Sequence, residues 1–344
     1  MVPAVTVRTG ARLHFGLLAV KPLHGRKFGG VGVMVEQPGF EICLRAASVD
    51  SINGGTSSTL LRIREFLTRV RGVSQADLPP VEMVIRREIP SHEGLGSGTQ
   101  LGLAVTAGLQ FLATGARSRA AQLAAGVGRG ARSAIGVHGF DEGGFLIEAG
   151  HQTEADISPL VARAVVPTAW RWLLISPRES AGLSGAAEQQ AFRQLPSMPE
   201  SLTSTLCRIL LMDWLPAMLA ADFAVSASAM WEYGQRVGEF FTCVQGNRFA
   251  HPRMAALAET LRRRGISGIA QTSWGPTIAV LCPDPEHASE LQHWISTQQG
   301  EEGLSTRITA SRNTGAEVVA QEWEPPIPTL GVEDRQSRLR SNHG

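Results

Sequence analysis

The chain has 344 residues, of which 43% are hydrophobic and 18% are charged, so its composition is that of an ordinary globular protein with one large or two moderate domains. Its 32 lysines and arginines nearly balance its 31 aspartates and glutamates, which leaves a formal net charge of +1. This balance gives no broad basic surface, and nucleic acid is therefore not an expected partner.

The cysteines and the apolar segments indicate a cytoplasmic protein. The N-terminal segment has no apolar stretch of the length of a signal peptide. The most apolar later window, residues 206–225, contains Arg208, Asp213, Pro216 and Asp222, which argues against a membrane span. The cysteines are scattered without a Cys-x-x-Cys pair, and we expect reduced thiols at Cys43, Cys207, Cys243 and Cys282.

The first half of the chain is predicted to be rich in strands, with inserted helices. Strands are expected at residues 5–20, 32–46 and 81–86, and helices at 59–71, 101–113 and 119–127. Residues 128–148 are predicted to form a glycine-punctuated loop that leads into a short strand. The order is that of an α+β fold and not of regular βαβ alternation.

The second half is predicted to be a split β-α-β unit with extra helices. Strands are expected at 170–176, at 306–311 and on both sides of a small-residue turn within 266–281, and helices at 202–221, 223–243, 285–298 and from Pro252. Beyond Pro325, a polar segment rich in arginine predicts a disordered tail.

The segment Pro90-Ser-His-Glu-Gly-Leu-Gly-Ser-Gly-Thr-Gln100 is the most informative part of the sequence. It joins the alternating strand at 81–86 to the apolar helix at 101–113, so its glycines lie where the backbone turns sharply. The free N–H groups at the start of that helix, together with the helix dipole, favour binding of a di- or triphosphate. A purely structural turn is the alternative that the spacing alone leaves open.

Both common nucleotide-binding patterns are disfavoured. The loop has no Walker lysine, because Gly98-Thr99-Gln100 stands where Gly-Lys-Ser would be required. It also lacks the Gly-x-Gly-x-x-Gly spacing of a Rossmann unit.

The strand-rich first half with Pro-x-x-x-Gly-Leu-Gly-Ser-Gly at 90–98 before a buried helix, followed by the small-residue Gly-Pro turn at 270–277 (AQTSWGPT), resembles the GHMP kinase superfamily. The resemblance covers roughly residues 3 to 320. It implies a two-domain α+β fold with an N-terminal, ribosomal-protein-S5-like β-α-β half at 1–165. The C-terminal half, at 166–322, would be a ferredoxin-like split β-α-β unit with extra helices, followed by a tail at 323–344.

Within that superfamily three strings, residues 10–17 (GARLHFGL), 90–100 and 128–136 (GRGARSAIG), look like those of the β-ribofuranosylaminobenzene 5′-phosphate synthases of tetrahydromethanopterin biosynthesis. The resemblance implies condensation of phosphoribosyl pyrophosphate with 4-aminobenzoate or 4-hydroxybenzoate and release of CO₂ and pyrophosphate. Many GHMP kinases carry Pro-Ser-Gly-x-Asp where this chain has Arg132-Ser-Ala-Ile-Gly136, which departs from the kinase pattern. An ATP-dependent small-molecule kinase and a non-catalytic metabolite sensor remain the alternatives.

The site residues follow from this interpretation. The pyrophosphate is expected on the backbone of Gly94, Leu95, Gly96, Ser97, Gly98 and Thr99. Arg12 and Arg132 are expected to bind the ring carboxylate and the 5′-phosphate, because the planar guanidinium suits both groups. Arg12 and His14 alternate with Leu13 on a strand and so share one face. His92 is expected to contact phosphate or to move a proton.

Further substrate contacts are predicted at Lys27, Ser133, Thr272 and Trp274, of which the tryptophan would stack on the acceptor ring. Magnesium is the expected cofactor, with Ser97 and Asp141 as its predicted ligands. The fold resemblance also implies a homodimer. A valine in place of Gly96 is expected to block the anion while leaving the fold largely intact.

Overall fold

The computed structural model describes residues 3–74, 77–153, 157–178, 182, 185–299 and 303–323. The predicted tail lies outside the described residues except for Trp323, whose ring lies 4.7 Å from the Arg45 guanidinium carbon.

The strands of the described chain form three sheets. The first has the order β13-β1-β4-β6-β5, the second β10-β11-β9-β12 and the third β2-β3-β7-β8. Their bounds are β1 (Pro3–Arg8), β2 (Ala11–Ala19), β3 (Phe28–Val35), β4 (Glu41–Ala46), β5 (Ser51–Asn53), β6 (Val81–Arg87), β7 (Phe145–Glu148), β8 (Leu160–Ala164), β9 (Arg171–Pro177), β10 (Ile269–Gln271), β11 (Ile278–Cys282), β12 (Leu304–Ala310) and β13 (Glu317–Glu322).

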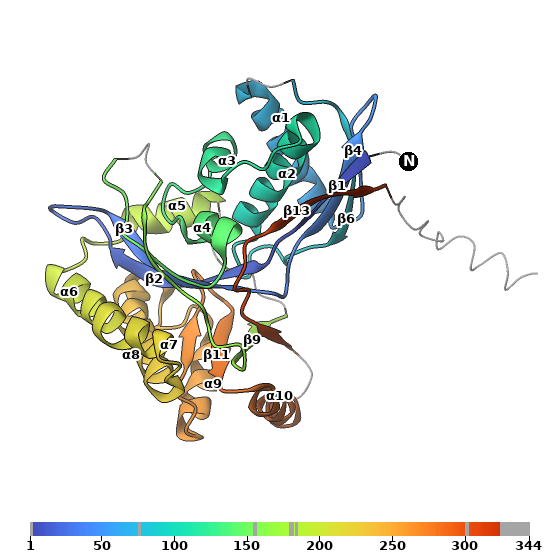
Figure 1. The fold of residues 1–344 in the computed structure, drawn as a ribbon. Coiled ribbons are helices and arrows are strands. Elements are labelled where there is room, and N and C mark those ends of the chain that lie inside the picture. Colours follow the sequence, from blue (N-terminus) through green and yellow to red (C-terminus); the bar gives the residue numbers. More distant parts are fainter. Residues whose placement is uncertain are drawn as a thin grey trace, which may run out of the picture.

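Most helices lie in two groups in Figure 1. One group is α1 (Ser57–Val73), α2 (Ser97–Thr114), α3 (Ala120–Gly126) and α4 (Ile135–Glu142); the other is α6 (Glu200–Arg208), the π-helical η1 (Ile209–Trp214), α7 (Leu215–Leu219), α8 (Phe223–Gln245), α9 (Pro252–Arg263) and α10 (Pro285–Gln299). Helix α5 (Gly185–Gln194) is drawn between the two groups. Helix α2 packs on β1 and β4 and against α1, α3 and α4, which buries it as its apolar sequence predicts.

The architecture confirms the predicted α+β fold, but several elements differ from those predicted. Residues 5–20 and 32–46, each expected to be one strand, are divided between β1 and β2 and between β3 and β4. The sequence also predicts no element where β5, β8 and α5 lie.

Residues 135–142, expected to be part of a loop, form α4. Residues 317–322, for which the sequence predicts no element, form β13 and pair antiparallel with β1, so that Pro3 faces Glu322. Figure 1 shows β13 beside β1. The domain boundary at residues 165 and 166 stays a prediction, although a strand from the second half completes the sheet of the first.

The continuous helix Glu200–Leu219 is long and apolar enough to cross a membrane, by length and composition alone. Helices of protein cores pass the same test. In this structure Leu206, Leu210 and Trp214 on that helix are buried, whereas Met212 and Leu219 are exposed.

Aromatic side chains join the two halves of the chain beneath the site described below. Phe15 of β2 lies 5.8 Å from Trp172 of β9 and 5.4 Å from Trp214 of η1, measured between ring centroids. Phe145 of β7 packs on the same Trp214 at 5.2 Å. Interlocked rings of this kind hold β2 in a fixed position relative to the second sheet.

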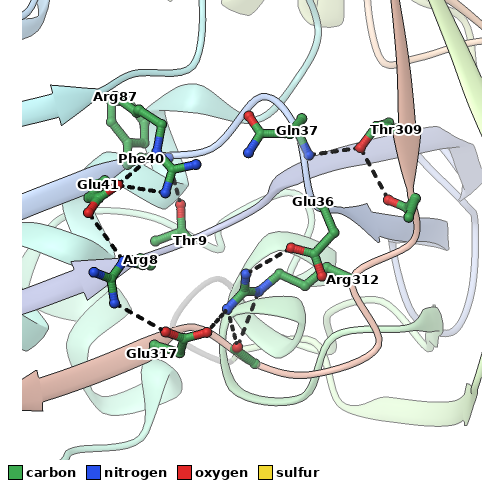
Figure 2. Close-up of polar contacts among 12 residues, drawn as sticks. Arg8, Thr9, Glu36, Gln37, Phe40, Glu41, Arg87, Thr309, Arg312 and Glu317 are labelled. Carbon is green, nitrogen blue, oxygen red and sulfur yellow. Dashed lines mark hydrogen bonds and ion pairs between the residues drawn. The ribbon is translucent and has the colours of Figure 1, made fainter.

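Polar contacts tie the segment between β12 and β13 to the first sheet (Figure 2). The buried Arg312 donates to the carbonyl of Gly315 and forms ion pairs with Glu36 at 3.1 Å and Glu317 at 3.5 Å. Arg8 lies nearer the solvent and pairs with Glu41 at 3.2 Å and with Glu317 at 3.5 Å.

We expect Arg312→Met to lower the free energy of unfolding by about 3 kcal/mol, because it removes the buried partner of two carboxylates and a carbonyl. Arg8→Met is the matched control and is expected to cost at most about 1 kcal/mol, since the Arg8 side chain is itself 35% exposed and Glu41 keeps its ion pair with Arg87 at 2.6 Å. Urea unfolding of both variants measures the difference. Equal losses would contradict a special contribution from Arg312.

Candidate active site

A cavity of about 480 Å³ opens where the glycine loop meets the second half of the chain. Its walls come from β2, residues 94–99, residues 128–133, α5, α8 and the turn at 271–275. The glycine loop therefore lies in a cavity and not in a closed structural turn, which supports the functional interpretation of its sequence.

Two segments, the turn at 271–275 and β2, hold the glycine loop in place. The Thr272 hydroxyl donates to the carbonyl of Gly94 at 2.9 Å and accepts from the backbone N–H of His14 at 3.0 Å. The backbone N–H of Arg12 donates to the carbonyl of Leu95 at 3.0 Å. A Cβ on Gly94 would collide with the carbonyl oxygen of Thr272, and the φ angle of Gly94 is +76°. Glycine is required there because loop and turn approach so closely.

The first turn of α2 presents backbone donors to the cavity. Gly96 is the residue that precedes the helix, and its φ angle is +72°. Its carbonyl accepts from the N–H groups of Thr99 and Gln100, both at 3.2 Å. Among the described residues, no backbone acceptor is found for the N–H groups of Ser97 and Gly98, which line the cavity. Free donors at a helix N-terminus are suited to an anion.

Arginines supply most of the charge of the cavity. Those that line it are Arg12, Arg62, Arg129, Arg132 and Arg248, and within the described part of the chain Glu188 is its one acidic lining residue. Nε and Nη1 of Arg12 are shielded from solvent without a hydrogen-bond partner in that part of the chain. Burial lowers the pKa of Arg12 to about 10, so its guanidinium remains charged at neutral pH. A cavity with this excess of cations is suited to a polyanionic ligand.

Aromatic side chains form one wall of the cavity. The ring of Trp274 lies 5.1 Å from both Phe192 and Phe241 in edge-to-face contacts. Glu188 accepts from Nε1 of Trp274 at 3.0 Å and pairs with Arg132 at 3.1 Å. The Arg132 guanidinium also lies 4.7 Å from the Phe192 ring centre. Arg132 is thus fixed at the edge of an apolar wall.

His14 is buried beside Arg12, and its Nε2 has no hydrogen-bond partner in the described structure. Burial, and then the positive charge of Arg12, hold the pKa of His14 well below its usual value of 6.5. The imidazole is therefore neutral at pH 7 and is able to accept or donate one hydrogen bond through Nε2.

This shifted pKa predicts a pH dependence of stability. The unfolded chain protonates His14 near pH 6.5 and the folded chain does not, so stability is lost as the pH falls below 6.5. At pH 5.5 the contribution of this histidine amounts to at most about 1.4 kcal/mol. Urea unfolding at pH 7.5 and 5.5 should show a smaller loss in His14→Gln than in the original chain. An identical loss in both would contradict the neutral state of His14.

The structure brings most of the predicted site residues together. Arg12, His14, His92, Arg132, Ser133, Trp274 and residues 94–99 all line the cavity. The φ angle of His92 is +64°, and its carbonyl accepts from the N–H of Gly182 at 2.6 Å. The Ser133 hydroxyl accepts from the N–H of Ile135 at 3.3 Å and so caps α4. The roles of these residues in binding stay predictions.

Three predicted residues lie outside the cavity. Thr272 is fully buried, and its hydroxyl joins Gly94 of the glycine loop to His14 of β2. Lys27 forms backbone hydrogen bonds with His151. Both carboxylate oxygens of Asp141 accept from the N–H of Ala120, at 2.9 and 3.1 Å, which caps α3. Asp141 is therefore committed to helix capping and is not placed as a metal ligand.

Several lining residues were missed by the sequence interpretation. Arg129 lies within the 128–136 string, so a signal for it was present. Arg62 lies on α1 among other arginines, and no local pattern separates it from a solvent-exposed side chain. Glu148, which does not line the cavity, is a third omission: it is fully buried and accepts from the N–H of Ala134 at 2.7 Å, which holds the 128–134 segment in place. Burial raises the pKa of Glu148.

Comparisons with known proteins agree with this geometry. The family model for the GHMP kinases N terminal domain matches residues 58–143, and the one for GHMP kinases C terminal matches residues 220–299. The crystal structure of mevalonate diphosphate decarboxylase from Staphylococcus aureus has a TM-score of 0.65 and 14% identity, covering 93% of this chain and 98% of that one. A homoserine kinase structure from Cytophaga hutchinsonii has a TM-score of 0.61 and 16% identity, covering 92% and 97%.

Two curated relatives narrow the comparison. The beta-ribofuranosylphenol 5′-phosphate synthase of Methanothermobacter thermautotrophicus is 28% identical over 92% of this chain and 99% of its own length. The enzyme of the same name from Archaeoglobus fulgidus is 27% identical over 91% and 98%. The chain is therefore a homologue of the beta-ribofuranosylphenol 5′-phosphate synthases within the GHMP kinase superfamily.

Proposed function

We propose that this protein condenses phosphoribosyl pyrophosphate with a para-substituted benzoate, forms a carbon–carbon bond to the ribose and releases CO₂ and pyrophosphate. The observation that carries the proposal is the composition of the cavity, which is lined by a glycine loop, five arginines and a cluster of aromatic side chains. A donor with two phosphorylated ends and an acceptor with an apolar ring and one carboxylate match those surfaces. The name of the curated relatives favours 4-hydroxybenzoate as the first acceptor to test and 4-aminobenzoate as the second.

The reaction needs little proton transfer. The ring carbon that bears the carboxylate forms a bond to the anomeric carbon, and the bond from that carbon to the diphosphate oxygen breaks. The electron pair of that bond leaves with the diphosphate. The bond between the ring and its carboxylate then breaks, and its electrons restore the aromatic ring as CO₂ departs. Stabilisation of the leaving diphosphate is the main demand, and fixed backbone donors meet it.

The residues in and near the cavity suit a reaction that needs no general base. Gly136, at the position where many GHMP kinases carry an aspartate, lies in α4 against Thr99, and a Cβ there would be 3.3 Å from the Thr99 methyl. The one acidic lining residue in the described chain, Glu188, is bound to Arg132 and Trp274. A kinase that deprotonates a hydroxyl would need a free carboxylate as a base, and Glu188 is not free. A decarboxylating condensation does not require a base of this kind.

Magnesium forms part of the proposal. A related solved structure, described as MDDEF in complex with MVAPP, AMPPCP and magnesium, has a TM-score of 0.65 and 17% identity over 93% of this chain and 100% of that one. The described residues contain no group of three or more His, Cys, Asp or Glu side chains that could hold a metal ion. Magnesium commonly binds through substrate phosphates and keeps several waters. The Ser97 hydroxyl in the cavity fits that mode, and a bound ion would offset charge on the diphosphate.

We also propose a cytoplasmic homodimer. Free cysteines support the reducing compartment, since Cys43, Cys207, Cys243 and Cys282 are all unpaired. The exposed Leu211, Met212 and Leu219 give an apolar surface that a second copy would cover.

The decisive test incubates the purified protein with phosphoribosyl pyrophosphate, carboxyl-labelled 4-hydroxybenzoate and magnesium, without ATP. Labelled CO₂ and pyrophosphate are expected in equal amounts. ATP-dependent phosphorylation of an alcohol or acid, with no release of CO₂, would replace the proposal with a kinase. Tight binding of phosphoribosyl pyrophosphate without turnover of either substrate set would indicate a sensor.

A further inference from the structure

The cavity has a different chemistry at each end of the glycine loop. At the first end, Gly94 touches the turn that carries Trp274, because a Cβ there would contact Thr272 and Gly275. In the middle, a Cβ on Gly96 would lie 3.3 Å from Nε of Arg12. At the far end, a Cβ on Gly98 would collide with Nη2 of Arg62 and lie 3.0 Å from Nη2 of Arg129.

The arginines at the far end have no anionic partner in the described chain. Arg62 donates to the Ser91 hydroxyl at 3.4 Å, and Arg129 lies over the Phe66 ring with 5.6 Å between guanidinium carbon and ring centre. No ion pair within 4.0 Å joins either arginine to a described carboxylate. Glu65 and Glu188 raise the pKa of Arg62 and of Arg129, respectively, from a longer distance, and Glu188 is already paired with Arg132. Nε of Arg129 is shielded from solvent without a hydrogen-bond partner in the described chain.

Electrostatic strain at this end is consistent with a missing anion. Burial lowers the pKa of Arg62 and also that of Arg129, for which the nearby charges of Arg62 and Arg69 are the next causes. Two guanidinium groups that converge on one backbone position repel each other unless an anion lies between them. The free N–H groups of the first turn of α2 point to the same place and add to the attraction for an anion.

We propose that Arg62 and Arg129 bind the diphosphate that leaves the ribose and are catalytic residues of the reaction. This inference rests on the proposed function. Displacement at the anomeric carbon requires the nucleophile and the leaving group on opposite sides of that carbon. With the acceptor ring at the aromatic wall beside Gly94, the leaving diphosphate lies toward Gly98, where the two guanidinium groups receive the negative charge that develops as the carbon–oxygen bond breaks.

Binding of fragments of the donor separates this role from recognition of the 5′-phosphate. Isothermal titration calorimetry with inorganic pyrophosphate and with ribose 5-phosphate is performed on the full chain and on Arg62→Gln and Arg129→Gln. Each substitution is expected to weaken pyrophosphate binding by about 10- to 100-fold, the effect of losing a hydrogen bond between charged groups. Binding of ribose 5-phosphate is expected to change less than twofold.

Arg64→Gln is the matched control, because Arg64 lies two residues from Arg62 on the same helix, is exposed and does not line the cavity. It is expected to leave both affinities unchanged. Arg62→Lys should recover part of the affinity for pyrophosphate, since it restores the charge without the planar fork. In steady-state assays, Arg62→Gln is expected to lower kcat with phosphoribosyl pyrophosphate and to leave the KM for the benzoate unchanged.

The outcomes separate this inference from the proposed function. If ribose 5-phosphate loses affinity and pyrophosphate does not, the arginine pair holds the 5′-phosphate and the inference is overturned. Unchanged affinity for both fragments, or no pyrophosphate binding to the original chain, overturns it as well. If the original chain shows no condensation while Arg62→Gln still loses pyrophosphate binding, the diphosphate site stands and the proposed reaction fails.

Discussion

Replacing Arg12 with methionine is expected to lower kcat/KM for the condensation by about 10²-fold or more, because the substrate group that its guanidinium binds would no longer be held in position for the reaction. Within the described residues its guanidinium has two shielded nitrogens without partners, so the folded chain leaves this hydrogen-bonding capacity for the substrate. Methionine has a similar length and no charge to bury. The free energy of unfolding is therefore expected to stay the same or to rise.

Steady-state kinetics and urea unfolding test this pair of expectations together. Arg12→Lys is the informative companion, because it keeps the charge but loses the planar fork, and it should recover only part of the activity. A methionine variant that retains the original turnover would show that Arg12 does not contact the reacting groups. A variant that loses stability and activity together would assign Arg12 a structural role.

Gly96→Val is expected to abolish turnover for a reason that differs from the one the sequence suggests. The new Cβ would lie 3.1 Å from the Cβ and 3.3 Å from Nε of Arg12, so it displaces that side chain instead of only filling the space for the anion. The φ angle of +72° also strains any β-branched residue, at a cost of about 1 to 3 kcal/mol. We expect kcat/KM to fall by more than about 10²-fold.

The opposite end of the same helix provides the control. Gly115 follows α2 with a φ angle of +70°, and a Cβ there would meet nothing within 4 Å. Gly115→Val therefore carries similar backbone strain without touching the cavity. Thermal unfolding should show comparable losses for both variants, while only Gly96→Val loses turnover. If Gly115→Val were equally inactive, general destabilisation would explain both results.

The part of the fold nearest the glycine loop could be predicted from the sequence because its signals are local. Alternation at residues 81–86, the stop at Pro90, and the apolar run after Gly98 each limit the backbone without help from distant segments. The structure has β6 and α2 at those places. The same local rules confirm α9, with proline at its start and Gly265 beyond its end.

Long-range packing determines the elements that could not be predicted. Helix α4 contains Gly136 and Gly139, which disfavour a helix by propensity, yet a Cβ on Gly139 would collide with the sulfur of Met34. Glycine at position 139 therefore allows α4 to lie close to β3. Strand β13 is an edge strand whose residues are mostly exposed, and its pairing with β1 bridges more than 300 positions of sequence. No local window contains that information.

The residues of the candidate site also differ in whether a local sequence signal predicts them. Arg12 and Arg132 belong to recognisable strings, and their residue type and position in those strings are enough to propose them. Arg62 and Glu188 come from helices whose sequences resemble ordinary solvent-exposed faces, and only the fold brings them to the cavity. Conversely, no sequence signal shows whether Thr272 holds the glycine loop in place or contacts the substrate.

The pairing of Pro3 with Glu322 makes the order of synthesis relevant to folding. The first sheet supports α2, yet its edge strand β13 is synthesised more than 300 residues after β1. Until residues 317–322 have been synthesised, β1 has one unpaired edge, which exposes it to pairing with other nascent chains. The sheet beneath the glycine loop is therefore completed only after the second half of the chain has been made, so the two halves are expected to fold as one kinetic unit.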